Sequence, residues 1–501
     1  MAWIWVGLAV VAAVGLAWPL LAMAGHGVGM RARRALRRRV GVTTRQTLRR
    51  FRARIDRFKL TQKAQVRAAL LQDPVLGKAV AEAAAHDEVD KDVGLDVDGA
   101  WERAELYLDE IVPSFNILSY FRVGYSVARV SLGGLYALDL DPADAERLRP
   151  LLADKNKSLL FLINHRSNAD FVLLGWALAH RVALSYAVGE WARVWPLEPL
   201  FKSFGSYFVR RGERDPLYHA VLARYVQHIA QNGVTQGVFL EGGLSRDGAL
   251  RPPKVGLLDS ILLAKHDAAF RRELWIIPTG ITYDRVLEDE TLIQEAGGRK
   301  PEHWQRRKLL LRQARQVAGY LFGQGWKWLL ERQRKFGHAA LRIGEPMRVD
   351  DWLAAHPELT TLDRAARKPI LEAYATQVME NIGRNMAVLP MGILACILQQ
   401  RQALPEAEAR VLFDEMAQDL RARGARLWQP HPRVRDPFKL ARQMLVRRGV
   451  LKAVEGALVV TEGAREIVAY YARGLHMWMP EVLSPTRNAA LPVPRDVEKV
   501  G

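Results

Sequence analysis

Between about residues 150 and 345, short apolar runs alternate with longer segments in which apolar residues recur every three or four positions. The first pattern is typical of buried strands and the second of amphipathic helices, so their order predicts an α/β domain with a mixed or parallel sheet and flanking helices. The expected strands are Leu159–Ile163, Val182–Val188, Tyr207–Val209, Gly237–Leu240, Trp275–Thr282 and Ala339–Ile343. The expected helices are Phe171–His180, Pro216–Gln231, Gly256–His266 and Trp304–Phe336.

Segments with helical periodicity flank this domain, from Thr43 to about Leu132 and from Asp350 to about Trp478. The acidic residues Asp139, Asp141 and Asp144 mark a junction before the first expected strand. The predicted divisions are a first segment (1–30), a basic and helical N-terminal region (31–135), the α/β domain (136–350) and a helical C-terminal region with a polar tail (351–501).

The segment Ala2–Ala24 contains no charged side chain. As a helix it would be about 34 Å long, enough to cross a hydrocarbon core of about 30 Å. Ala22-Met23-Ala24 resembles a signal-peptide cleavage site, but the basic block follows the apolar run instead of preceding it. That order predicts a single N-terminal membrane anchor with the rest of the chain on the cytoplasmic face. A cleaved signal peptide and a buried hydrophobic helix are the alternatives.

Positive charge is concentrated directly after the predicted anchor. Residues 31–59 hold twelve arginines and Lys59 against Asp56, and so supply +12 of the total charge of +19. This pattern favours contact with anionic lipid headgroups; the block lacks the interleaved aromatic residues of a nucleic-acid-binding segment, and no nucleic acid partner is expected. The sole cysteine, Cys396, lies in an apolar run and is predicted to be a small core residue.

The most informative motif is the stretch Asn164 to Asp170, directly after the expected strand Leu159–Ile163. It contains His165 and Asp170, five positions apart, in a turn between a strand and a helix. Such a turn can bring Asp170 onto one ring nitrogen of His165, leaving the other nitrogen free to take a proton from a hydroxyl group. The same spacing is common by chance, so the motifs that follow it matter.

Three further motifs follow in order. In the second motif, Gly205 to Arg211, a short apolar strand is followed by two arginines, which could bind a phosphate between them. Phe239 to Gly248 runs from a strand into a glycine-rich turn whose backbone, Ser245 and Arg246 could contact phosphate oxygens, and Lys254 adds one more cation beyond it. Ile276 to Gly280 is apolar, and Pro278 fits the end of a strand. The alternative for the second motif is a solvated strand end, and for the third it is a plain glycine-rich hairpin. The fourth motif is expected to support the site and not to react.

These four motifs together resemble those of the membrane-associated glycerol-3-phosphate acyltransferases, and the likeness extends over roughly residues 100 to 480, including Tyr470 to Trp478. The resemblance implies that His165 and Asp170 are catalytic. It also implies substrate-binding roles for Gly205, Phe208, Arg211, Glu241, Gly242, Gly243, Ser245, Arg246, Lys254 and Pro278.

The implied reaction is transfer of an acyl chain from an acyl thioester, either acyl-coenzyme A or acyl-carrier protein, to the sn-1 hydroxyl of glycerol 3-phosphate. No metal and no cofactor is expected. The chain departs from the family at Leu244, where an arginine that helps to bind phosphate is usual. Acylation of lysophosphatidic acid or dihydroxyacetone phosphate therefore stays open. From a different class, a membrane-anchored scaffold or nucleic-acid-binding protein also stays open.

Overall fold

A computed structural model describes residues 63–89, 96–189, 197–210, 212–297, 336–428 and 435–480, together with 46–47, 55 and 193. The predicted anchor Ala2–Ala24 and the arginines Arg31–Arg39 lie outside these residues, as does the expected helix Trp304–Phe336 except for Phe336. Among the helices that are described, none is both long enough and apolar enough to cross a membrane.

In the described part of the chain, eight strands form one mixed sheet with the order β1-β7-β6-β2-β5-β3-β4, and β8 pairs with β6. The strands are β1 (Ala137–Leu140), β2 (Lys157–Ile163), β3 (Ser185–Gly189), β4 (Tyr207–Val209), β5 (Gln236–Phe239), β6 (Glu273–Tyr283), β7 (His338–Ile343) and β8 (Met347–Arg348). The run from β6 to β4 is parallel, whereas β7 and β8 are antiparallel to β6. The predicted α/β domain with a mixed sheet is confirmed, and its parallel strands bring their carboxyl ends to one edge.

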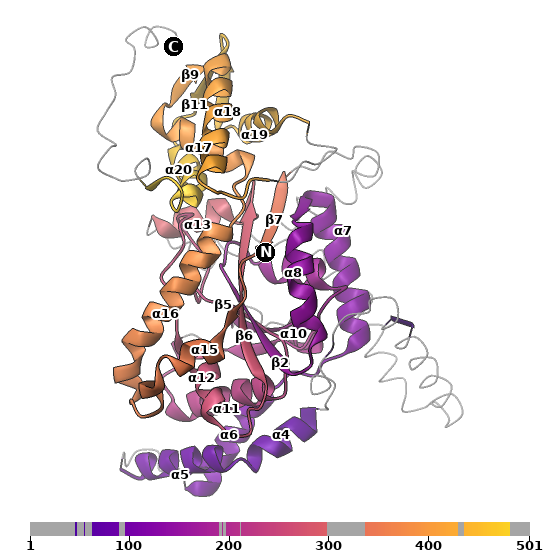
Figure 1. Cartoon of the computed structure of the whole chain (residues 1–501), viewed down its shortest axis with the longest axis vertical. Coiled ribbons are helices and arrows are strands. Elements are labelled where there is room, and N and C mark those ends of the chain that lie inside the picture. Colours follow the sequence, from indigo (N-terminus) through magenta and orange to yellow (C-terminus); the bar gives the residue numbers. More distant parts are fainter. Residues whose placement is uncertain are drawn as a thin grey trace, which may run out of the picture.

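Helices cover both faces of this sheet (Figure 1). They are α4 (Lys63–Leu71), α5 (Pro74–Val89), α6 (Val97–Ile111), η3 (Ser119–Gly124), α7 (Tyr125–Leu135), α8 (Pro142–Ala153), α9 (Asp170–Leu178), α10 (Leu197–Ser203), α11 (Pro216–Gln231), α12 (Gly256–Leu263), η5 (Ala264–His266), α13 (Asp289–Ala296), α15 (Val349–Ala354), η6 (Pro357–Thr360) and α16 (Arg364–Asn385).

The central strand β2 shows why two helical layers are needed. Its residues Leu159, Phe161 and Ile163 belong to one buried cluster together with residues of α8 and α9. Leu160 and Leu162 belong to a second cluster with residues of α11, α12 and α16. Because successive side chains of a strand point to opposite faces, a continuous apolar run of this kind requires cover on both sides.

The first strand was missed by the sequence interpretation, which placed only a junction there. β1 contains Asp139, a residue type that usually argues against a buried strand. Asp139 is buried and accepts two 2.9 Å hydrogen bonds from the Arg342 guanidinium on the paired strand β7. The following Asp141 caps α8, accepting from the Ala143 N–H at 3.0 Å. A partner about 200 residues away therefore explains the charge in this strand.

The C-terminal region contains α17 (Pro390–Gln400), α18 (Glu406–Ala422), α19 (Pro437–Arg447), α20 (Arg465–Ala472) and η7 (Arg473–Leu475). The expectation of a wholly helical region is wrong, because β9 (Ala403–Pro405), β10 (Leu451–Val454) and β11 (Ala457–Val460) form a small antiparallel sheet. The residues between β10 and β11, Glu455 and Gly456, both have positive φ (48° and 81°), as a tight hairpin turn requires. Such short strands leave little periodicity to detect.

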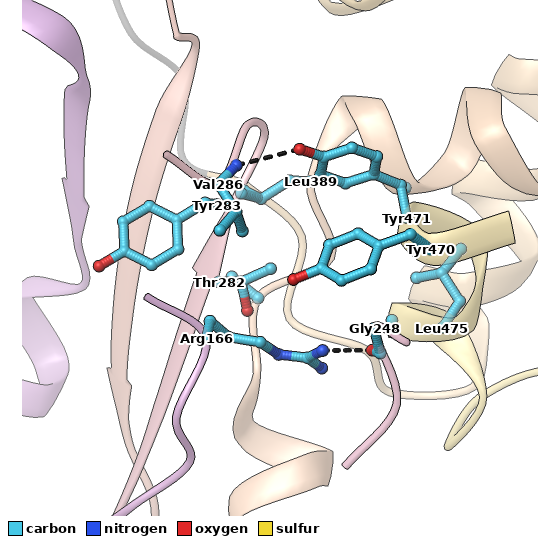
Figure 2. A pocket seen from close by; sticks show the side chains of 12 residues that line it. Arg166, Gly248, Thr282, Tyr283, Val286, Leu389, Tyr470, Tyr471 and Leu475 are labelled. Carbon is cyan, nitrogen blue, oxygen red and sulfur yellow. Dashed lines mark hydrogen bonds between the residues drawn. The ribbon is translucent and has the colours of Figure 1, made fainter. Parts of the chain in front are cut away.

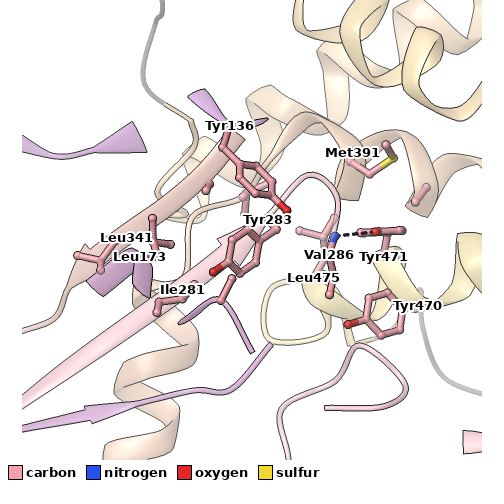
Figure 3. Close-up of a cluster of buried hydrophobic side chains, with 14 of the residues drawn as sticks. Tyr136, Leu173, Ile281, Tyr283, Val286, Leu341, Met391, Tyr470, Tyr471 and Leu475 are labelled. Atoms are coloured by element: carbon pink, nitrogen blue, oxygen red, sulfur yellow. Dashed lines mark hydrogen bonds between the residues drawn. The ribbon is translucent and has the colours of Figure 1, made fainter. Parts of the chain in front are cut away.

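The C-terminal region packs onto one end of the α/β domain (Figure 1). Cys396 of α17 is fully buried, as the sequence predicts. At the junction, Ile281 and Tyr283 of β6 belong to the same buried cluster as Met391, Tyr471 and Leu475 of the C-terminal region (Figure 3). One continuous core therefore joins the two parts of the chain.

Candidate active site

The turn between β2 and α9, residues 164–170, is named here the His–Asp turn. His165 Nδ1 lies 2.9 Å from Asp170 Oδ2, and both side chains are buried. Since a carboxylate can only accept, Nδ1 carries the proton in this contact and Nε2 is left as the basic nitrogen. Among the residues that the structure describes, none forms a hydrogen bond with Nε2. The contact expected from the spacing of the motif is therefore present.

Asp170 is held from four directions. Its Oδ2 also accepts from the backbone N–H of Arg166 (2.7 Å) and Ser167 (3.0 Å), and its Oδ1 accepts from the Tyr283 hydroxyl (2.8 Å). Burial, with Asp170 next in effect, raises the pKa of Tyr283 well above its usual value, so the phenol stays a proton donor. These bonds fix the carboxylate in one orientation, and through it the imidazole.

The glycine-rich turn, residues 241–248, lies against the His–Asp turn because β5 and β2 are parallel neighbours. The His165 N–H donates to Glu241 Oε1 (2.8 Å), and the His165 carbonyl accepts from the Ser245 N–H (2.9 Å). The His165 ring stacks on the Phe239 ring, with centroids 4.1 Å apart. The first and third motifs thus form one structural unit around the imidazole.

Glu241 joins these two segments. Its Oε2 accepts from the Arg251 N–H at 3.0 Å, so each carboxyl oxygen receives one backbone hydrogen bond. Burial raises the pKa of Glu241, and the opposing influence of nearby Arg166 is weaker. In this arrangement the carboxyl group acts as an internal acceptor that holds the turns together.

The remaining residues of the glycine-rich turn shape its backbone. Gly242 has φ of 63°, and a Cβ there would lie 2.8 Å from Lys254 Cγ, so a larger residue would be both strained and crowded. Gly243 is buried. Ser245 Oγ donates to the Ala249 carbonyl at 2.6 Å, closing the turn from within.

Of the arginine and lysine side chains that the motifs suggest as phosphate ligands, the structure describes Arg210, Arg246 and Lys254. Arg246 is 56% exposed and pairs with Glu295 Oε2 at 3.2 Å. Lys254 is exposed. Arg211 lies outside the described residues. The expected arginine fork is wrong for Arg210, whose guanidinium is bound by Glu110 (2.7 Å) and Glu213 (2.9 Å).

The other predicted residues are packed within the sheet. Gly205 has φ of 81° just before β4, and Phe208 is fully buried in the core. Pro278 was expected at the end of a strand, and this expectation is wrong. It lies in the middle of β6, opposite Leu162 of β2. Its carbonyl accepts from the Gly344 N–H (2.8 Å), between β7 and β8, so the missing N–H of proline falls where the partner strand is interrupted.

Sequence reasoning missed several residues that hold the site. The Asn164 amide exchanges two hydrogen bonds with the Ile281 backbone (2.7 and 2.9 Å). The Arg166 guanidinium donates to the Gly248 carbonyl. The partners are 82 to 117 residues away, so no local pattern could reveal them. The only available signal was the position of Asn164 and Arg166 on either side of His165.

A cavity lies between the two turns and the C-terminal region (Figure 2). Its wall includes Arg166, Gly248 and Thr282 from the α/β domain and Tyr470 and Leu475 from the C-terminal region. A second, mainly apolar cleft runs along α9 and is lined by Tyr120, Tyr125, Phe171, Val172, Trp176 and Phe204. Within the described ranges, no group of three His, Cys, Asp or Glu side chains is placed to bind a metal ion.

The sheet and the His–Asp turn are those of an acyltransferase domain: residues 144–282 match the acyltransferase family. Residues 326–477 match a second family, the glycerol-3-phosphate acyltransferase C-terminal region. The chain therefore joins an acyltransferase domain to a glycerol-3-phosphate acyltransferase C-terminal region, and the resemblance indicated by the four motifs is confirmed.

Two relatives have the name glycerol-3-phosphate acyltransferase. The protein from Aeromonas hydrophila is 29% identical over 350 residues, which are 68% of this chain and 41% of that protein. The protein from Glaesserella parasuis is 30% identical over 339 residues, which are 66% of this chain and 38% of that protein. The chain thus matches about two fifths of the length of these relatives.

Among solved structures, the crystal structure of the 1-acyl-sn-glycerophosphate acyltransferase from Thermotoga maritima is similar with a TM-score of 0.29 and 14% sequence identity. The alignment covers 64% of this chain and 97% of that chain.

Proposed function

We propose that this protein transfers an acyl chain from an acyl thioester to the sn-1 hydroxyl of glycerol 3-phosphate, giving lysophosphatidic acid for phospholipid synthesis. The observation that carries the proposal is the contact of His165 Nδ1 with Asp170 at the carboxyl end of a parallel strand, which leaves Nε2 without a hydrogen bond from the described residues. The match to the glycerol-3-phosphate acyltransferase C-terminal region supports the choice of acceptor.

In the proposed reaction, His165 Nε2 takes the proton of the acceptor hydroxyl as that oxygen attacks the thioester carbonyl carbon. Asp170 holds the ring and stabilises the imidazolium that forms. The tetrahedral adduct then collapses with loss of the thiolate, which recovers the proton from His165. No acyl-enzyme intermediate is needed, and the acyl donor, acyl-coenzyme A or acyl-carrier protein, is the only other substrate, without a cofactor.

Two features of the structure suit the two substrates. The apolar cleft along α9 is lined by Phe171 and Val172, the two residues that follow Asp170 in that helix, and we assign the acyl chain to it. Arg246 in the glycine-rich turn and Lys254 just beyond it are exposed cations. We assign the acceptor phosphate to them and to Arg211, and attachment to membrane lipids to Ala2–Ala24 and the basic block, which keep the catalytic domain on the cytoplasmic face.

The test is product formation by membranes that contain this protein, with palmitoyl-coenzyme A and either glycerol 3-phosphate, lysophosphatidic acid or dihydroxyacetone phosphate. Lysophosphatidic acid formation from glycerol 3-phosphate should fall by about 10²–10⁴-fold in a His165→Ala variant. Turnover of another acceptor alone would mean that Leu244 marks a changed acceptor site.

Loss of the protein from the membrane fraction when residues 1–30 are deleted tests the anchor. No turnover with acyl-coenzyme A or acyl-carrier protein, together with salt-sensitive DNA binding, would favour the scaffold alternative.

A further inference from the structure

The C-terminal helix α20 touches the glycine-rich turn through its backbone. A Cβ added to Gly248 would lie 1.8 Å from the Tyr470 carbonyl oxygen, so only glycine allows this approach. The Gly248 carbonyl accepts from the Arg166 guanidinium (Figure 2). Just beyond α20, Arg473 Nη1 donates to the Asp247 carbonyl at 3.0 Å. The glycine-rich turn is therefore held between the His–Asp turn and α20.

The His–Asp turn is held from a second side by Glu288, directly before α13. The Ser167 hydroxyl donates to Glu288 Oε2 (2.8 Å), and the Asn168 N–H donates to Glu288 Oε1 (3.1 Å). Both donors lie between His165 and Asp170 in the chain. The position of Glu288 therefore bears directly on the loop that connects the two proposed catalytic residues.

The C-terminal region fixes this same segment through the next residue, Asp289. Asp289 Oδ2 accepts from the Tyr471 hydroxyl and lies 2.7 Å from Arg448 Nη1. The Tyr471 hydroxyl in turn accepts from the Val286 N–H at 3.0 Å (Figure 2). Asp289, Tyr471 and the Arg448 side chain are all at least nine-tenths buried, so these contacts are shielded from water.

From these contacts we propose that Tyr471 and Arg448 are positioning residues for the His–Asp turn, acting through Asp289 and Glu288. The inference rests on the proposed function, because it assigns the two residues a part in that reaction. A buried ion pair is weak evidence for net stability, so we assign the Arg448–Asp289 pair a role in fixing geometry. Catalytic geometry is sensitive at this scale, since displacements of about 1 Å can reduce rates by about 10²-fold. Tyr471, in the C-terminal stretch Tyr470 to Trp478, thus gains a role that its distance in sequence from His165 does not suggest.

The test uses the full chain and two variants of different severity. Tyr471→Phe keeps the buried ring and removes only the hydroxyl bonds, and Arg448→Ala leaves Asp289 without its cation. We expect kcat for acyl transfer to fall by about tenfold or more in both, with KM for either substrate changed less than about threefold. Arg448→Lys should recover part of kcat because the charge is retained. Arg410→Ala is the control for loss of a more exposed arginine–aspartate pair within the C-terminal region, since Arg410 pairs with Asp436.

Hydrogen–deuterium exchange of the same proteins gives a readout that needs no turnover. Amides of residues 165–170 should exchange faster in Tyr471→Phe and Arg448→Ala than in the wild type or Arg410→Ala. Faster exchange confined to the C-terminal region, or a kcat within twofold of wild type in Tyr471→Phe, would overturn the inference. If the wild type does not acylate glycerol 3-phosphate, the proposed function fails, while exchange at residues 165–170 still decides whether Tyr471 and Arg448 hold the turn.

Discussion

The His–Asp turn and the basic side chains beyond the glycine-rich turn differ sharply in how they are held. Asp170 accepts four hydrogen bonds and is fully buried. Arg246 and Lys254, by contrast, are exposed, and the only ion pair of Arg246 in the described chain is with Glu295. The side chains proposed to transfer the proton are thus held in place by the protein, whereas Arg246 and Lys254, proposed to bind the acceptor, are exposed to solvent. Substitutions in the first region should therefore lower kcat, and substitutions in the second should raise KM.

The largest effect among the supporting residues is expected for Asp170→Asn. The amide oxygen can still accept from the backbone N–H groups of Arg166 and Ser167, so the turn should fold, but the negative charge that stabilises the imidazolium is lost. We expect kcat to fall by about 100-fold or more, with KM for glycerol 3-phosphate nearly unchanged. Steady-state kinetics at saturating acyl donor measure both. A kcat close to wild type would separate Asp170 from the proton transfer.

A smaller effect on kcat, with a clear loss of stability, is expected for Glu241→Gln. A glutamine amide has only one acceptor oxygen, so one of the two N–H groups, of His165 or Arg251, loses its partner. An unpaired buried donor costs about 1–3 kcal/mol, measurable by urea unfolding, and kcat should fall by about tenfold because His165 shifts. Unchanged stability would show that the two bonds do not both form in solution.

The stability difference between the wild type and Glu241→Gln should depend on pH, because glutamate titrates and glutamine does not. Burial raises the pKa of Glu241 in the folded protein above its usual value of 4.5, so the folded state favours the protonated form. The contribution of this group to stability is therefore fully present below pH 4.5 and is lost as the pH rises through the raised pKa. The stability difference between the wild type and Glu241→Gln should accordingly narrow as pH rises. A difference that widens instead would mean that the carboxylate is the favoured form.

What the sequence could predict of the site depends on whether the interacting residues are close together in the chain. The apolar run of β2 and the spacing of His165 and Asp170 are local features, and both the strand and the contact are present. The acceptors and donors that hold this turn, such as Tyr283 and Glu288, come from more than 100 residues away. Local patterns carry no information about such partners. The sequence therefore predicted the proposed catalytic pair but not the residues that orient it.

The predictions from the sequence were wrong where a residue distant in the chain supplies a partner that the local pattern does not show. Asp139 argues against a strand until Arg342 is paired with it, and Arg210 looks free to bind phosphate until Glu110 is placed beside it. Pro278 suggests a strand end, yet it sits within β6 opposite a break between two partner strands. In each case the residue type was interpreted correctly for an isolated strand. The neighbouring strand or helix changed the outcome.

The smallest effects are expected for the exposed cations. Lys254→Ala and Arg246→Ala each remove one positive charge from a solvated position, where screening limits a single contact. We expect KM for glycerol 3-phosphate to rise by about three- to tenfold in either variant, with kcat and folding stability unchanged. In the structure Arg246 is paired with Glu295, which would compete with the acceptor phosphate for its guanidinium. Glu295→Gln removes that competing charge and should therefore lower KM for glycerol 3-phosphate if Arg246 binds the acceptor.

Measuring KM for both substrates in Arg246→Ala and Lys254→Ala shows which substrate the two cations contact. A charge that contacts the acceptor phosphate should change KM for glycerol 3-phosphate and leave KM for palmitoyl-coenzyme A within about twofold. If Arg246→Ala and Lys254→Ala raise only the KM for the acyl donor, the two cations bind the donor's phosphates instead. If neither KM changes, the acceptor phosphate must be held elsewhere, and Arg211 becomes the residue to substitute next. In every case, the separation of the two regions predicts that kcat is preserved, because neither cation is bonded to the His–Asp turn in the described structure.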